Sequence, residues 1–131
     1  MSGKVVRVLP VTQYKFSAAF SVIVARRIDV SQYANAALLF RLHETSSWNN
    51  GDIIVIKVFN DGFTDEDPTT TFMSSVSALS LSFQGGVDTA PELSFDSTSS
   101  VGSLVTIIVE GTYGQVQETD IKVSADLVLK D

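Results

Sequence analysis

Four carboxylates stand within seven residues in the segment from Asp61 to Asp67, which also contains Gly62 and Phe63 and is followed by Pro68. Calcium takes six to eight oxygen ligands, and an acidic loop of this kind can supply them. Asp61, Asp65 and Asp67 are therefore the candidate ligands of a calcium site. Their spacing lacks the glutamate that completes an EF-hand loop. We favour the alternative, a solvated turn in which Asp and Gly serve the backbone geometry.

Catalytic groups are sparse in this chain. His43 is the only histidine and there is no cysteine, so a zinc site lacks its usual ligands. A serine hydrolase would need His43 as the base beside a positioned Ser, and the G-x-S-x-G motif is absent. Gly85-Gly86 lacks the Lys and Ser/Thr of a phosphate-binding loop. Glu44, Glu92, Glu110 and Glu118 could serve as the carboxylates of a glycoside hydrolase, but such enzymes need a scaffold that shapes a cleft. We expect no enzyme activity, no cofactor and no bound metal.

The single tryptophan, Trp48, stands in the run Ser-Ser-Trp-Asn-Asn-Gly, where a turn is expected. An exposed Trp stacks on sugars or anchors a protein partner. The alternative is a Trp that folds back as a lid over the end of the fold, and we favour this second interpretation. Both remain open at the level of sequence.

Charge is unevenly distributed along the chain. Residues 1–57 hold seven basic and three acidic residues, whereas residues 58–121 hold ten acidic residues and no basic one. Opposite charges on different surfaces of one subunit favour head-to-tail contacts between copies. Arg26 and Arg27 are the basic residues that we expect to take part, and Asp65 and Glu66 are the acidic ones.

The overall composition limits the possible partners. The 131 residues carry a net charge of −6 and a pI of about 4.6, which argues against nucleic acid and anionic membranes. No apolar run approaches the length of a membrane span. The N-terminus shows no signal-peptide pattern, so we expect synthesis in the cytoplasm without export by that route. Charged residues make up only 18%, with Ser and Thr in their place, as suits packed subunit contacts.

The elements that must position these residues are strands. Apolar and polar residues alternate with a period of two almost throughout, and no long amphipathic helix is indicated. Pro10 should stop the first strand, and Ile53 to Asn60, apolar on both faces, should be central in its sheet. The predicted strands cover residues 4–9, 14–28, 38–42, 53–60, 72–83, 93–95, 104–112 and 117–129.

Asn50-Gly51 lies between two of these strands and predicts a type I′ β-hairpin, the turn with two positive φ angles. About eight strands with turns at this spacing predict an all-β fold, a single antiparallel β-sandwich domain over residues 1–131. A jelly roll is our first expectation and an immunoglobulin-like sandwich is the second.

The stretch Ile28 to Leu42 contains Asp29-Val30-Ser31-Gln32-Tyr33 ahead of a strand, and it resembles galactose-binding-like jelly rolls over about 15 residues. The ligand-binding residues of that family have no clear counterparts here. In its general character the chain is also similar to small virion structural proteins of tailed bacteriophages, the decoration or tail-associated jelly rolls. This second resemblance implies symmetric assembly on a larger shell or tube.

These observations lead to two hypotheses of different classes. The first is a non-enzymatic structural protein, a virion component that acts through protein–protein contacts with itself or with a shell or tube protein, as a homo-oligomer. The second is a carbohydrate-binding module, for which Trp48 would supply the stacking ring. Light scattering and electron microscopy discriminate between them.

Overall fold

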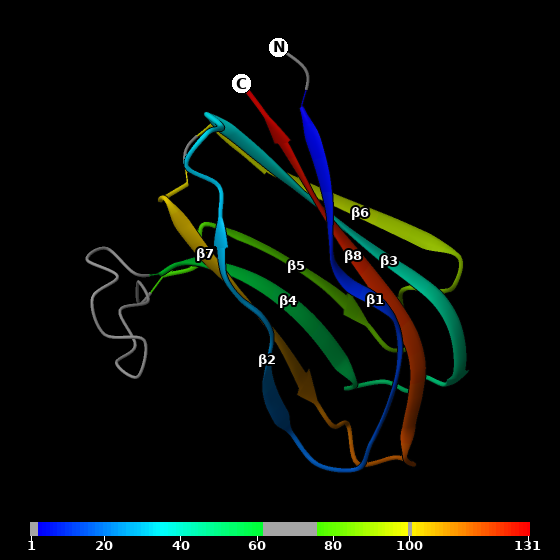
Figure 1. The fold of residues 1–131 in the computed structure, drawn as a ribbon. Coiled ribbons are helices and arrows are strands. Elements are labelled where there is room, and N and C mark those ends of the chain that lie inside the picture. The colour runs from blue at the N-terminus through cyan, green and yellow to red at the C-terminus, as the bar shows by residue number, and fades with distance from the viewer. Residues whose placement is uncertain (1–2, 62–75, 100) are drawn as a thin grey trace.

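Two four-stranded antiparallel sheets pack face to face in the computed structural model, which describes residues 3–61, 76–99 and 101–131 (Figure 1). Sheet A contains, in spatial order, β1 (Lys4–Phe16), β8 (Thr119–Lys130), β3 (Asn35–Ser47) and β6 (Glu92–Thr98). Sheet B contains β2 (Phe20–Asp29), β7 (Leu104–Thr112), β4 (Ile53–Asn60) and β5 (Leu79–Gln84). None of the described residues belongs to a helix that could span a membrane.

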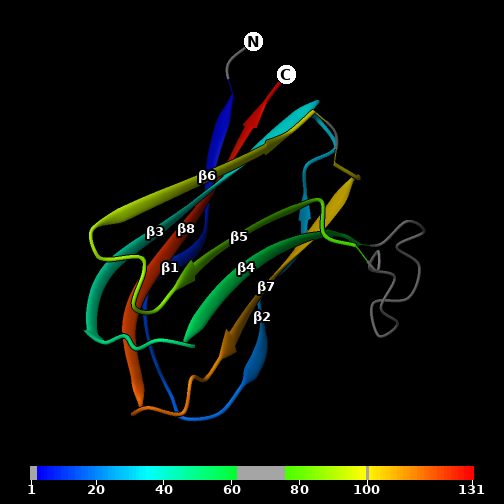
Figure 2. The same cartoon turned by 180° about the vertical axis from the view of Figure 1, so that it is seen from behind.

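The strand pairing is that of a jelly roll. Strand β1 pairs with β8, β2 with β7, β3 with β6 and β4 with β5, as in a long antiparallel ribbon rolled up on itself. Only β4 and β5 are consecutive neighbours in one sheet, and every other connection crosses between the sheets (Figure 2). The all-β sandwich predicted from the sequence is thus confirmed, and its first form, the jelly roll, is the one observed.

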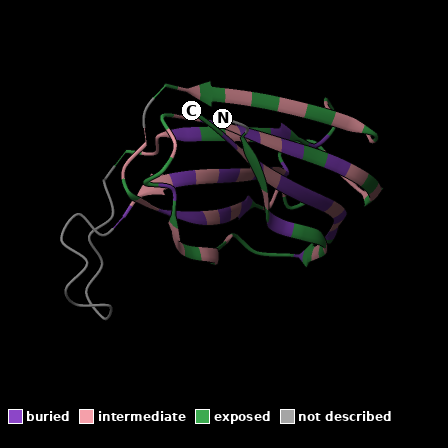
Figure 3. Cartoon of the chain, turned by 45° about the horizontal axis from the view of Figure 1, so that its top comes forward, coloured by how far each residue is buried: buried purple, intermediate pink, exposed green. Residues whose placement is uncertain are grey.

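The core fills the space between the sheets with apolar side chains from alternate positions of each strand. Sheet A contributes Leu38 and Phe40, and sheet B contributes Ile54 and Phe83; all four are at most 1% exposed. The rings of Phe40 and Phe83 meet across the layers with centroids 5.0 Å apart. Figure 3 shows this alternation of buried and exposed positions along the strands. The central position expected for β4 is confirmed by its place between β7 and β5.

Two predicted strand limits near the N-terminus are wrong. Strand β1 does not stop at Pro10 but continues to Phe16, with register shifts against β8 between Arg7 and Thr12. An edge strand tolerates proline, because one side of the strand has no neighbour to which the missing N–H would have to hydrogen-bond. The strand predicted over residues 14–28 is divided into the end of β1 and the whole of β2, where the chain crosses from sheet A to sheet B.

The hairpin predicted at Asn50-Gly51 is also wrong, although the turn exists. The Asp52 amide donates to the Asn49 carbonyl at 3.0 Å, and only Gly51 has a positive φ, 91°. One positive φ at the third position is typical of a type II turn rather than type I′. Strands β3 and β4 belong to different sheets, so this turn joins the two layers instead of pairing its flanking strands.

Candidate interaction surface

The outer face of sheet A carries an apolar strip that crosses all four strands. The register aligns Val5, Val128, Ala37 and Ser97 in one transverse row and Arg7, Asp126, Leu39 and Phe95 in the next. Leu93 follows beside Arg41. We call the set Val5, Ala37, Leu39, Leu93, Phe95 and Val128 the apolar strip. Val5, Leu93 and Phe95 are 64%, 50% and 61% exposed, which is unusual for large apolar side chains on a sheet.

Strand β6 explains why the strip exists. Its alternation places Leu93 and Phe95 on the outer face and their neighbours Glu92, Ser94 and Asp96 on the inner side. The Asp96 carboxylate accepts the Ser80 amide at 3.1 Å, so it joins the ends of β5 and β6. The strand therefore presents its apolar residues to solvent and uses its polar residues inside the fold.

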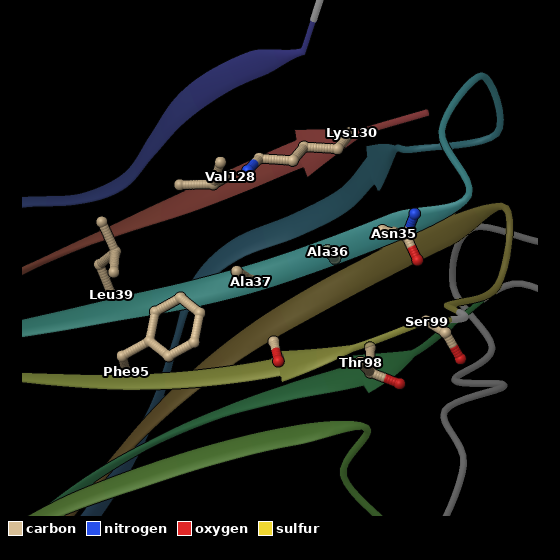
Figure 4. A pocket seen from close by; sticks show the side chains of 10 residues that line it. Asn35, Ala36, Ala37, Leu39, Phe95, Thr98, Ser99, Val128 and Lys130 are labelled. Atoms are coloured by element: carbon tan, nitrogen blue, oxygen red, sulfur yellow. The ribbon is translucent and has the colours of Figure 1, made fainter.

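A shallow groove runs along the strip where β3, β6 and β8 lie side by side. Its volume is about 460 Å³, within the range of ligand pockets. Figure 4 shows Leu39, Phe95 and Val128 along its floor, and Lys130 and Asn35 toward one end. Ser97, Thr98 and Ser99 complete the polar rim. An apolar floor with a few polar groups suits a partner side chain better than a charged metabolite.

The outer face of sheet A carries more basic than acidic side chains. The outward side chains of sheet A include five basic and three acidic residues: Arg7, Lys15, Arg41, Lys122 and Lys130, with Glu44, Asp120 and Asp126. Arg7 pairs with Asp126, and Lys122 pairs with Glu44 at 2.8 Å. Arg41 and Lys130 form no ion pair within the described residues. Lys130 lies at one end of the groove, and Arg41 lies outside the groove on the same face of the sheet, beside Leu93.

Arg26 and Arg27 were predicted to contact another subunit together, but their side chains lie in different environments. Arg27 has a positive φ of 54°, and its side chain is only 17% exposed because it turns back on the fold. Its Nη1 lies 3.6 Å from Oδ1 of the fully buried Asp61. Only Arg26 is exposed. The acidic residues proposed as their partners, Asp65 and Glu66, lie outside the described residues.

Thr106 completes the cluster around Arg27. Its hydroxyl accepts the Arg27 amide at 3.1 Å and donates to Asp61 Oδ2 at 2.5 Å. The calcium interpretation therefore loses one ligand, because Asp61 is already engaged inside the protein. Asp65 and Asp67 lie outside the described residues. Among the residues that the structure does describe, no cluster of three or more His, Cys, Asp or Glu could hold a metal ion.

Trp48 folds back onto the end of the sandwich. Its ring is partly buried against the core, and its indole N–H donates to the Asp88 carbonyl at 3.0 Å. This is the lid arrangement, one of the two interpretations that the sequence left open. The indole N–H is thereby used within the fold.

His43 lies on the outer face of β3 and is hydrogen-bonded to Ser124, with 2.7 Å between Nε2 and Oγ. Ser124 is only 3% exposed, so its oxygen is poorly placed to attack a substrate. No described carboxylate is hydrogen-bonded to the second ring nitrogen, as a catalytic triad requires. The pair is best understood as a cross-strand polar contact.

Asp52 is a structural residue that the sequence interpretation missed. It is fully buried, and its carboxylate accepts the amides of Asn49 at 3.0 Å and Gly114 at 2.7 Å. Its carbonyl accepts the Gly85 amide at 2.7 Å. Three turns are therefore tied together at one end of the sandwich. An Asp directly after Asn-Gly was the available signal, since Asp commonly bonds nearby backbone amides in turns.

The sequence matches no known family profile and no curated protein. The fold resembles part of a chain in the structure of infectious bursal disease virus Gx strain, with a TM-score of 0.53 and 13% identity. That match covers 97% of this chain and 31% of the viral chain, so this chain spans about a third of its length. A second structure, of Desmodium yellow mottle tymovirus, aligns over 98% of this chain and 88% of that chain, with a TM-score of 0.36 and 9% identity. The first likeness supports the jelly-roll fold.

Proposed function

We propose that this chain is a structural subunit of a virus particle or a related protein shell, and that it acts through protein–protein contacts. The observation that carries the proposal is the apolar strip on a jelly roll. Monomeric proteins rarely expose contiguous large apolar patches, and such patches mark interaction sites. Phe95 and Leu93, half or more exposed beside each other on the outer face, are the residues that a partner would cover.

The likeness to a viral structure over nearly the whole chain is consistent with this role. The structure found belongs to infectious bursal disease virus, so a tailed bacteriophage as the source is a narrower proposal that rests on sequence character alone. Decoration of a capsid and association with a tail are two forms of that proposal. In either form the protein would be a homo-oligomer or a partner of a larger shell protein.

A carbohydrate-binding module is the weaker candidate. Its main support was an exposed Trp48, and this ring is instead packed against the fold with its N–H bonded to Asp88. The apolar strip offers Phe95 as an exposed ring, but large aliphatic side chains surround it, as in protein interfaces.

Light scattering coupled to size-exclusion chromatography tests the proposal, with electron microscopy of the assembled fraction. The intact chain should associate as its concentration rises, and Phe95→Ser should shift the population toward monomer. Val116→Ser is the matched control, because Val116 is 63% exposed in the connection between β7 and β8, outside the strip. A chain that stays monomeric at every concentration and binds glycans would contradict the proposal.

A further inference from the structure

The edge strands of the two sheets differ in how well their free backbone groups are protected. An edge strand exposes unpaired N–H and C=O groups to which a strand of another molecule can pair, and native proteins blunt such edges with proline, bulges or charged side chains. Strand β1 contains Pro10 and two register shifts against β8, and β2 has two register shifts against β7. Neither of these edges offers a regular row of groups to a partner strand.

The edge of β5 is protected by carboxylates. The Ser80 amide donates to Asp96 at 3.1 Å, and the Gln84 amide donates to Asp88 at 2.7 Å. Both amides therefore face away from β4, and both are already satisfied within the same copy. A partner strand would have to displace two charge-assisted hydrogen bonds at this edge.

Strand β6 is the edge that remains open. It pairs only with β3, in a register without a shift over its whole length, and it contains neither proline nor a basic residue. The Ser97 amide faces the free edge, because it donates to the Asp96 carboxylate at 2.9 Å. Amides alternate in direction along an antiparallel strand, so those of Leu93 and Phe95 face the same edge. Within the described residues, no side chain accepts either of these two amides.

The residues of β6 are self-complementary. When two β6 strands pair antiparallel over their full length, Phe95, the middle residue of the strand, lies opposite Phe95 of the second copy. In this register Ser94 lies opposite Asp96 and Thr98 lies opposite Glu92, so each carboxylate meets a hydroxyl group. The two Phe95 rings form an aromatic cross-strand pair on the outer face, and such pairs stabilise sheets. Shifting the register by one residue in either direction places acidic residues opposite each other, which is destabilising.

We infer that two copies of this chain join through β6, in an antiparallel pairing centred on Phe95 that makes one continuous sheet from the two A sheets. This inference rests on the proposed function and specifies one of its contacts. The contact is isologous, since both copies use the same surface and are related by a two-fold axis. The Ser97 amide exchanges the Asp96 carboxylate for the Leu93 carbonyl of the second copy. The two apolar strips then form one longer strip, which remains open to a further partner.

Cysteine cross-linking tests this register, because the chain contains no cysteine of its own. Leu93 of one copy lies opposite Ser97 of the other, so the double variant Leu93→Cys/Ser97→Cys should form disulfide-linked dimers on oxidation. Each single variant should not, because identical residues then lie four positions apart along the paired strands, about 13 Å, whereas a disulfide needs Cα atoms within about 7 Å. Val116→Cys, exposed outside β6, measures cross-linking by random collision. Cross-linking of the double variant no greater than that of Val116→Cys would overturn the inference.

Two substitutions at Leu93 distinguish backbone pairing from side-chain contact. Leu93→Ala shortens the side chain and keeps the amide, whereas Leu93→Pro also removes the amide, at an edge position where proline is tolerated. Analytical ultracentrifugation should show dimers of Leu93→Pro that are weaker than those of Leu93→Ala by about tenfold or more, because two hydrogen bonds are lost in each dimer. Circular dichroism monitors the fold of both variants, and the cross-linking decides if the proline variant is unfolded. Equal affinities of the two folded variants would contradict the pairing.

Light scattering of the wild type separates this inference from the proposed function. If the wild type assembles but the double-cysteine variant shows no specific cross-link, the inference is wrong and the proposed function stands. If the wild type stays monomeric at every concentration, the proposed function fails, and the inference fails with it.

Discussion

Single buried polar residues hold the ends of this sandwich together, at places where backbone amides would otherwise lack a partner. Asp52 accepts amides from Asn49 and Gly114, and Thr106 links the amide of Arg27 to the carboxylate of Asp61. A buried amide that loses its acceptor costs about 1–3 kcal/mol of stability. The residues of greatest structural consequence are therefore polar ones that a hydrophobicity pattern does not mark.

Replacing Gly51 with Val should destabilise the fold by about 1 kcal/mol or more, because a β-branched residue disfavours positive φ. The new Cβ would also lie 3.0 Å from the Cα of Gly114. Urea unfolding measures the effect. Ser82→Val is the matched control, at an exposed position of β5, and it should change stability little. An unchanged midpoint for Gly51→Val would contradict the turn geometry.

Charge reversal should have different effects on stability at Arg26 and at Arg27. Arg27→Glu removes one partner of a buried pair and sets two carboxylates against each other, so we expect a loss of about 3 kcal/mol in unfolding free energy. Arg26→Glu alters an exposed side chain and should leave the unfolding free energy nearly unchanged. A test of assembly that reverses both arginines would confuse folding with docking. Equal stability of the two single variants would argue against the buried pair.

Asp29 gives the turn after β2 a measurable dependence on pH. The Ser31 hydroxyl and then the Ser31 amide donate to its carboxylate and hold the pKa of Asp29 below its ordinary value. A lowered pKa in the folded state adds stability above the unfolded pKa of about 4, and this contribution is lost as pH falls through the folded value. Ser31→Ala should raise the pKa toward the ordinary value in an NMR titration. The pKa should stay slightly low, since the amide remains.

At the scale of elements, the sequence predicts the limits of a strand best where one run of alternating polar and apolar residues corresponds to one strand. The limits expected for β4 and β7, residues 53–60 and 104–112, are those observed. The break between β1 and β2 could not be seen, because Phe16 and Phe20 keep the same alternation on both sides of a crossing between sheets. Their rings pack edge to face, with centroids 5.0 Å apart.

The candidate site was harder to predict than the fold. Alternation identifies two faces of a strand but not which strands lie together, and the strip depends on pairs such as Leu39 with Phe95 and Ala37 with Val128. These pairs follow from long-range register, which local patterns do not encode. The apolar residues Leu93 and Phe95, alternating with the polar residues Glu92, Ser94 and Asp96, were the available sign.

The connection between β4 and β5 should not depend on calcium. Asp61, at its start, is engaged by Thr106 and Arg27, which leaves fewer carboxylates for a cation. Neither a chelator nor added Ca²⁺ should therefore move the melting temperature measured by differential scanning calorimetry. A rise in melting temperature on adding Ca²⁺ would restore the calcium interpretation, because a ligand that binds only the folded state stabilises it.

At the scale of the whole molecule, the outer face of sheet A carries a charge opposite in sign to that of the chain as a whole. The outward side chains of sheet A, with five basic and three acidic residues, carry +2, so the rest of a chain with net charge −6 carries −8. If copies associate as proposed, the basic face of one copy would be attracted to the net negative charge of another. Such complementarity accelerates docking more than it tightens the complex.

Added salt should then slow the association of subunits, but it should not dissociate assemblies that have already formed. Ions screen exposed charges beyond about 8 Å at physiological ionic strength, whereas the apolar contacts of Phe95 and Leu39 are not weakened by salt. Stopped-flow light scattering should show association rates that fall as salt rises, while preformed assemblies diluted into the same buffers dissociate at nearly constant rates. Reversing Arg41 and Lys130 to Glu should flatten this salt dependence, and Arg26→Glu should not. If the rates are independent of salt in the wild type, neutral contacts alone bring the subunits together.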